Sequence, residues 1–223
     1  MSVTIIIIVI TCIVSFICFN NEELMDKLIF YPPAVSVDHE WYRFFSCGII
    51  HKDIPHLLFN MYALYLFGQG QHNGGVEFEF ETIFGSAGKL FYILMYVAAF
   101  AVCLIPTYMT HKDNYQYKSL GASGAVSAVV FAFILFNPMQ GVGLIFIPVF
   151  IPGFLFGILY LVISYLLAKK GNSNINHSAH IWGGLFGIGF VVICAGIFGH
   201  YPVVANFLEQ VKTVRLNNLF STY

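Results

Sequence analysis

The chain has 223 residues, of which 58% are hydrophobic and 9% are charged, and its formal net charge is −1. A soluble domain carries about 25% charged residues. This composition therefore excludes a chain that covers itself with a water-facing surface, and it predicts a polytopic membrane protein embedded in a lipid bilayer. The net charge gives no electrostatic basis for binding nucleic acid.

Six stretches of the chain are apolar enough to suggest membrane-spanning helices, each of which needs about 20 residues. They are Val3–Phe19, Pro55–Gly68, Lys89–Met109, Leu120–Phe136, Gly141–Ala168 and Ser178–Phe198. The first stretch lacks the basic segment and the small-residue cleavage site of a signal peptide, so we expect it to be a retained helix. The fifth stretch is long and is interrupted by Pro148 and Pro152.

The segments between the predicted spans are more polar. Residues Trp41–Ile50 form an amphipathic stretch suited to the membrane interface, and Gln69–Gly85 is expected to be a loop. These lengths predict an all-α bundle of six transmembrane helices over residues 1–198, with both termini on one side. Residues 199–223 form a tail in which Val203–Leu219 is expected to be amphipathic.

Polar side chains within apolar spans are costly and are therefore candidates for function. One such group is His56 with Asn60, which are four residues apart and share a helix face. A second is Ser123, placed between Gly121 and Gly124 in the first turn of a predicted span. We expect the two glycines to leave room around the hydroxyl and the free N–H groups of that turn. Each group alone also fits simple helix packing through interhelical hydrogen bonds or small residues.

A third group is His180 at the start of span six, followed by glycines at positions 183, 184 and 187 on its own face. Such a stripe lets another backbone come close, and it also fits a packing motif with an incidental histidine. His177 and His180 have the spacing of a metal pair, but the chain has no HExxH motif and no convergent carboxylate. The five cysteines match neither a zinc site nor a disulfide framework. We therefore expect no metal and no cofactor.

The alternation of the spans brings the three groups together. Each lies near the start of an even-numbered span, and in a six-span bundle those starts face the same side of the membrane. A hydroxyl and an imidazole at one depth are suited to nucleophilic catalysis, with His180 taking the proton from Ser123. Since spans four and six hold no Asp or Glu, we predict a Ser–His dyad. His56, Asn60 and the Ser123 backbone N–H are the expected oxyanion donors.

The motifs resemble those of the rhomboid family of intramembrane serine proteases. The matching residues are Trp41-Tyr42-Arg43 for the Trp-Arg of the first loop, His51 and His56-Leu57-Leu58-Phe59-Asn60 for the HxxxN element, Glu81 for the acid after the second span, Gly121-Ala122-Ser123-Gly124 for GxSG, and His180, Gly183 and Gly187 for AHxxGxxxG. The resemblance covers residues 41–198. A GxSG motif alone would be weak, whereas several motifs in the family's order are strong.

The resemblance implies cleavage of a single-pass transmembrane substrate near the outer end of its helix, with small residues at the cut. It implies Ser123 as the nucleophile, His180 as the general base, and His56 with Asn60 in the oxyanion hole. It also implies a structural role for Arg43 in a first loop that lies partly in the membrane. Span five is the family's proposed gate.

The sequence departs from the family's pattern in two places. Ser127 stands one helical turn after Ser123, where some members carry a tyrosine that packs on the catalytic histidine. This departure leaves open what orients His180. In the first loop, Tyr42 separates the Trp and Arg that are adjacent in the family.

The resemblance also implies an orientation, with both termini in the cytoplasm and the site opening to the outer face of a bacterial plasma membrane. In that orientation the external segments hold Lys27, Arg43, Lys52, Lys112, Lys118, Lys169 and Lys170. The cytoplasmic side keeps Lys89, Lys212 and Arg215. The positive-inside rule favours the reverse. We follow the family's orientation.

Two other functions compete with proteolysis. A catalytically silent rhomboid-like protein would bind transmembrane clients without cutting them, but such proteins usually lack the serine or the histidine. A small transporter would use the polar groups as a solute path, but it predicts internal repeats and polar groups near the midplane. The sequence shows no repeat, and its polar groups lie at one end of the spans.

Overall fold

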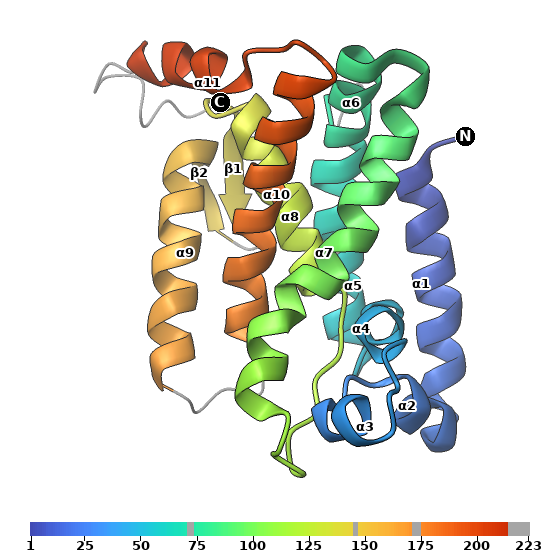
Figure 1. The fold of residues 1–223 in the computed structure, drawn as a ribbon. Helices are drawn as coiled ribbons and strands as arrows, with labels where there is room; N and C mark the ends of the chain where they lie inside the picture. The colour runs from blue at the N-terminus through green and yellow to red at the C-terminus, as the bar shows by residue number, and fades with distance from the viewer. Residues whose placement is uncertain (71–73, 145–146, 171–174, 214–223) are drawn as a thin grey trace.

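The computed structural model of the chain describes residues 1–70, 74–144, 147–170 and 175–213. Its helices and strands are α1 (Val3–Phe19), α2 (Glu22–Leu28), α3 (Pro32–Val37), α4 (Arg43–Ser46), α5 (Ile54–Leu64), α6 (Val76–Phe84), α7 (Gly88–His111), α8 (Ser123–Phe136), β1 (Gly141–Leu144), β2 (Ile147–Pro152), α9 (Gly153–Lys170), α10 (His177–Ile197) and α11 (Val203–Lys212). Short helical turns are η1 (Cys47–Ile49), the π-helical η2 (Tyr65–Gln69) and η3 (Gly85–Ala87). The long helices stand side by side as a bundle (Figure 1).

The helices alternate in direction along the chain. Helices α5, α8 and α10 begin toward the end of the bundle where α2 and α3 lie, whereas α6 and α11 lie at the opposite end (Figure 1). The sequence predicts this alternation for the spans that carry His56, Ser123 and His180. The starts of those three helices therefore gather at one end of the bundle.

Several helices have the length and apolar composition of membrane spans. Within the described residues, these are 76–111, which joins α6 to α7, together with α9 and α10. Helices α1 and α8 are apolar but shorter, with 17 and 14 residues. A helix of 14 residues is about 21 Å long, less than the roughly 30 Å of a hydrocarbon core. The chain is a multi-pass membrane protein, and the count of six spans stays a prediction.

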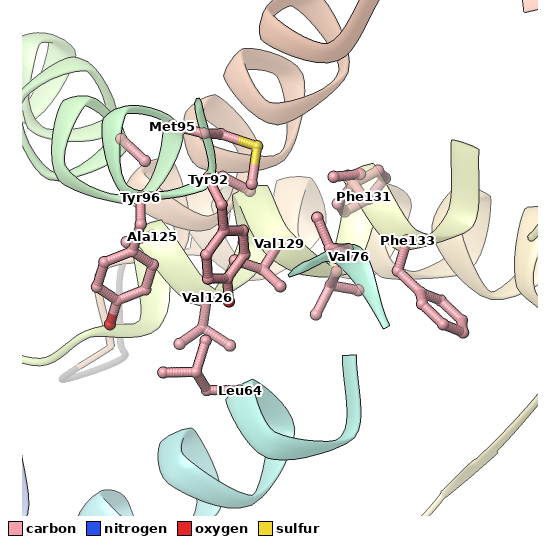
Figure 2. Packing of buried hydrophobic residues seen from close by; sticks show 14 of the residues in the cluster. Leu64, Val76, Tyr92, Met95, Tyr96, Ala125, Val126, Val129, Phe131 and Phe133 are labelled. Carbon is pink, nitrogen blue, oxygen red and sulfur yellow. The ribbon is translucent and has the colours of Figure 1, made fainter. Parts of the chain in front are cut away.

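Helix α8 is the centre of the bundle. Every residue from Gly124 to Phe136 is buried. Figure 2 shows side chains of α5, α7 and α8 gathered in one apolar cluster, with Leu64, Tyr92 and Val126 among them. A helix that is apolar on all sides has no amphipathic stripe and belongs in the interior. This helix therefore lies among its neighbours rather than against lipid.

Glycines on α10 bring it into backbone contact with α8. A Cβ atom on Gly183 would stand 2.1 Å from the carbonyl oxygen of Gly124, and one on Gly187 would stand 2.3 Å from that of Ala128. Both distances are shorter than any real contact of a Cβ atom, so these positions admit only glycine at this helix separation. The stripe predicted from the sequence is thus an α8–α10 contact surface.

The first part of the predicted fifth span is a β-hairpin, which corrects the all-α fold class. Strands β1 and β2 pair antiparallel, with Gly141 opposite Pro152 and Val142 opposite Ile151. Proline lacks a backbone N–H and obstructs a helix, and the β-branched and aromatic neighbours of the two prolines favour strands. The helix therefore begins only at Gly153, after the second proline.

The predicted loop Gln69–Gly85 is also wrong, because it contains helix α6. Val76 and Phe80 share a helix face and are fully buried, while Glu77 caps the start of α1. The Glu77 carboxylate accepts hydrogen bonds from the backbone N–H groups of Val3 and Thr4 at 2.7 and 3.0 Å. A carboxylate at a helix N-terminus satisfies free donors and interacts favourably with the helix dipole. Glu77 therefore has a structural function at the start of α1.

Other predicted boundaries agree more closely with the structure. Helix α1 has the predicted bounds Val3–Phe19, whereas α8 begins at Ser123 rather than Leu120. Helix α11 covers the first part of the predicted amphipathic tail, to Lys212. Residues 214–219 of the predicted stretch lie outside the described residues.

The backbone contact between α8 and α10 makes a prediction for two glycines of α10. Gly187→Ala should lower the free energy of unfolding by about 2 to 3 kcal/mol, because the new methyl group overpacks against Ala128 and separates the helices. Gly189→Ala is the matched control, since a Cβ at Gly189 meets nothing within 4 Å. That change should leave stability equal or higher by up to about 1 kcal/mol. Denaturant titration in detergent micelles measures both, and equal effects would contradict the close contact.

Candidate active site

Ser123 is the first residue of α8 and follows a turn that requires glycine. Gly121 has φ +117°, a backbone conformation that L side chains rarely adopt, and its N–H donates to the Cys47 carbonyl at 2.9 Å. A Cβ at Gly121 would stand 2.7 Å from Cε1 of His56. The glycine therefore lets the His56 ring lie directly against the backbone that precedes Ser123.

Gly124, on the other side of the serine, lies in close contact with two neighbouring helices. A Cβ there would stand 2.4 Å from Sγ of Cys103 on α7. The same face of Gly124 also carries the close contact with Gly183. This glycine therefore permits α7 and α10 to pack against α8.

His180 lies within hydrogen-bond distance of Ser123. Its Nε2 atom is 2.8 Å from Ser123 Oγ. The start of α10 is fixed by Asn176, whose side-chain oxygen accepts from the Ala179 N–H at 3.1 Å. Asn176 also exchanges hydrogen bonds with Thr107 of α7 at 3.0 and 3.2 Å. An Asn before an apolar run is a helix-capping signal that the sequence analysis did not use.

His56 and Asn60 lie one turn apart on α5, as their spacing predicted. Asn60 is 6% exposed, and its Nδ2 donates to the His56 carbonyl at 3.0 Å. An amide nitrogen carries two N–H groups, so this bond uses one of them. The structure brings the His56 ring to Gly121, two residues before Ser123.

His51 connects the turn before Ser123 to helix α1. The Ala122 N–H donates to His51 Nε2 at 3.3 Å, and His51 Nδ1 is 3.1 Å from Ser15 Oγ. Burial, aided by His56, lowers the pKa of His51 to about 3, so the ring is neutral and has one proton. Since Nε2 accepts, that proton is on Nδ1 and points to Ser15. The Ser15 hydroxyl in turn donates to the Ile49 carbonyl at 3.3 Å.

Arg43 lies in the first loop and holds its segments together. The residue is 7% exposed, and Nη1 donates to the carbonyls of Asp26 and Ile29 at 2.7 Å each. Its Nε donates to Glu40. The bonds join the segment after α1 to α4, which is a structural role within the loop.

Glu81 does not belong with the site residues. It forms an ion pair with Lys89 at 3.3 Å, and both side chains are more than 40% exposed. Helix α6 lies at the end of the bundle opposite the starts of α8 and α10 (Figure 1). The pair therefore connects α6 to α7 at that corner, far from Ser123.

Tyr160 of α9 is a neighbour of the Ser123–His180 pair that the sequence analysis missed. Its ring centroid is 6.1 Å from that of His180, and its Oη is 2.7 Å from Ser127 Oγ. The available signal was a hydroxyl within an apolar span, which needs a partner when buried. Within the described residues, no group of three His, Cys, Asp or Glu side chains has an arrangement that could hold a metal ion.

The chain was compared with known protein families and with curated proteins. A family model described as "Rhomboid domain" matches residues 38–197. The chain belongs to the rhomboid family. Similar curated proteins are "RHOMBOID-like protein 12, mitochondrial" of Arabidopsis thaliana, 29% identical over 74% of this chain and 49% of the relative, "Putative rhomboid protease YdcA" of Bacillus subtilis, 27% identical over 65% and 62%, and "Presenilin-associated rhomboid-like protein, mitochondrial" of Mus musculus, 31% identical over 73% and 39%. The chain spans about half the length of the Arabidopsis relatives it matches.

The hydrogen bonds of His51 make a prediction for α1. Ser15→Ala removes the acceptor of the buried Nδ1–H and should lower the free energy of unfolding by about 1 to 3 kcal/mol. Thr11→Val, one turn earlier on α1, is the matched control, because the buried Thr11 hydroxyl has no hydrogen-bond partner in the described part of the chain. That variant should be neutral or slightly stabilising. Unfolding in micelles measures both, and a neutral Ser15→Ala would rule out the proposed tautomer.

Proposed function

We propose that this rhomboid-family chain is an intramembrane serine endopeptidase that cleaves a transmembrane helix of a protein substrate. The observation that carries the proposal is the 2.8 Å contact between Ser123 Oγ and His180 Nε2 at the start of two adjacent helices. A nucleophile in hydrogen-bond contact with a base is the arrangement that acyl transfer requires. The name of the Bacillus relative, "Putative rhomboid protease YdcA", supports the same chemistry.

The reaction combines nucleophilic attack by Ser123 on the substrate with proton transfers through His180. His180 Nε2 accepts the hydroxyl proton while Ser123 Oγ attacks the scissile carbonyl carbon, and the carbonyl electron pair moves to its oxygen. His180 then donates that proton to the departing amide nitrogen, which leaves an acyl group on Ser123. Water then attacks the acyl carbonyl carbon while His180 takes its proton. His180 passes that proton to Ser123 Oγ as the ester bond breaks and the second product leaves. Helices α8 and α10 contain no carboxylate, which supports a dyad rather than a triad.

The negative oxygen of the tetrahedral intermediate needs donors, each worth about 3 kcal/mol. As the first residue of α8, Ser123 has a backbone N–H without an i−4 partner. The His56 ring lies against Gly121, two residues before Ser123. Asn60 retains a second amide N–H. We assign these three groups to the oxyanion hole.

The position of the pair and the family both support the proposed substrate class. The pair lies near one end of a helical bundle in a multi-pass membrane protein, so a single-pass transmembrane protein is the substrate that can present a peptide bond there. We place this end at the outer face of a bacterial plasma membrane, with small residues at the cut. Relatives named as mitochondrial and one from Bacillus share the family. The choice of a bacterial plasma membrane is therefore part of the proposal.

Cleavage of a single-span reporter by the purified protein tests the proposal. Ser123→Ala and His180→Ala should each lower the cleavage rate by at least about 10³-fold, and the double variant should be no worse than either single change, because the two residues act as a unit. A fluorophosphonate should label the wild type and fail to label Ser123→Ala. Gel analysis of products and of the labelled protein measures both effects.

Ser86→Ala is the matched control, since Ser86 is exposed and lies in η3, near α6. The Ser86→Ala variant should cleave the reporter and should be labelled by the fluorophosphonate as the wild type is. Cleavage that survives Ser123→Ala would overturn the proposed mechanism. A wild type that neither cleaves nor labels would instead favour a protein that binds transmembrane clients without cutting them.

A further inference from the structure

The ring of His180 faces an aromatic side chain from a different helix than the one that carries Ser123. The rings of Tyr160 and His180 are inclined by 32° with centroids 6.1 Å apart. On its other sides, Tyr160 packs against Phe131 of α8 at 5.6 Å and Phe156 of α9 at 6.0 Å. The Tyr160 ring, which α9 carries, therefore lies between α8 and the imidazole.

The Tyr160 hydroxyl also connects to the backbone of Ser123. Ser127 Oγ is 2.8 Å from the Ser123 carbonyl oxygen and 2.7 Å from Tyr160 Oη. The carbonyl can only accept, so the single proton of Ser127 points to it. Ser127 Oγ must then accept from Tyr160. The direction of the chain is thus Tyr160 Oη–H to Ser127 Oγ–H to the Ser123 carbonyl.

We propose that Tyr160 is a positioning residue for the Ser123–His180 pair, holding the imidazole by ring contact and the serine backbone through Ser127. The inference rests on the proposed protease function, for which the pair carries the chemistry. It also answers what orients His180 in a chain with a small residue at position 127. A ring attached to α8 at position 127 and the ring of Tyr160 from α9 would reach the same space.

The proposal makes the alignment of the pair depend on the docking of α9. Only 17% of the residues of α9 are buried, against 33% of an 18-residue segment of α10. Gly157, one turn before Tyr160, allows the approach, because a Cβ there would already be 3.3 Å from Ile134 and Phe131. Displacement of this peripheral helix would withdraw the aromatic ring and the hydroxyl together. The pair is therefore aligned when α9 is in place.

Kinetics of reporter cleavage test the positioning role. Tyr160→Leu should lower kcat by about 10- to 100-fold with little change in KM, since small misplacements of reacting groups cost rates of this order. Tyr160→Phe keeps the ring and should recover most of that loss, remaining within about 5-fold of wild type. Tyr165→Leu is the matched control on α9, because Tyr165 is 59% exposed, and its kcat should be unchanged.

A double-mutant cycle tests the hydroxyl chain without removing the ring. Tyr160→Phe combined with Ser127→Ala should be no slower than the slower single variant, because both changes interrupt one chain. Additive losses would overturn the hydrogen-bond part of the proposal. Equal kcat values for Tyr160→Leu and Tyr165→Leu would overturn the positioning role as a whole.

A spectroscopic measurement separates this inference from the proposed function. In protein labelled with ¹³C,¹⁵N-histidine, the His180 ring resonance is identified by its loss in His180→Ala. It should move in Tyr160→Leu and stay near its wild-type position in Tyr160→Phe and Tyr165→Leu. Absence of cleavage in the wild type would count against the protease alone, whereas an unmoved His180 resonance in Tyr160→Leu would count against Tyr160.

Discussion

The direct backbone contact between α8 and α10 is the constraint on which the rest of the molecule depends. Lipid supplies no hydrophobic force between apolar helices, so close association relies on van der Waals contact and on polar bonds. Gly183 and Gly187 place α10 against the carbonyls of Gly124 and Ala128. Because both helices are stiff, this separation carries to their first turns and sets the 2.8 Å distance between Ser123 and His180. A slightly larger separation would leave the two side chains apart.

Buried polar groups connect the outer elements to this central pair of helices. Asn176 joins the start of α10 to Thr107 of α7, His51 joins the turn before Ser123 to α1, and Glu77 joins α6 to the N-terminus of α1. In an apolar medium an unpaired polar group costs several kcal/mol. Each of these hydrogen bonds therefore favours the one arrangement of helices that keeps it. Small residues thus determine how α8 and α10 pack, and pairs of polar groups determine how the outer helices attach to them.

The sequence was informative where one local property decides the structure. Continuous apolar runs predicted the bounds of α1 and the presence of α8 and α10, and polar residues at the starts of alternate spans predicted which helix ends gather. It was misleading where two properties compete. The polar stretch Gln69–Gly85 suggested a loop although Glu77 within it belongs to a helix and caps α1. Residues 141–152 are as apolar as a span although their prolines obstruct a helix. Tyr160 was missed because its partners lie on α8 and α10, and no spacing within α9 reports a contact between helices.

The geometry of the pair has two parts with different origins. Its distance follows from the close backbone contacts of α8 and α10, whereas the orientation of the imidazole is constrained by the rings of Tyr160 on α9 and His177 on α10. The small residue at position 127 is a requirement of this arrangement. Its hydroxyl is 2.7 Å from Tyr160 Oη, so a large side chain there would occupy the volume of the tyrosine. Ser127 and Tyr160 therefore form one unit, in which the space left on α8 is filled from α9. A chain built this way links the orientation of its base to the packing of its outermost long helix.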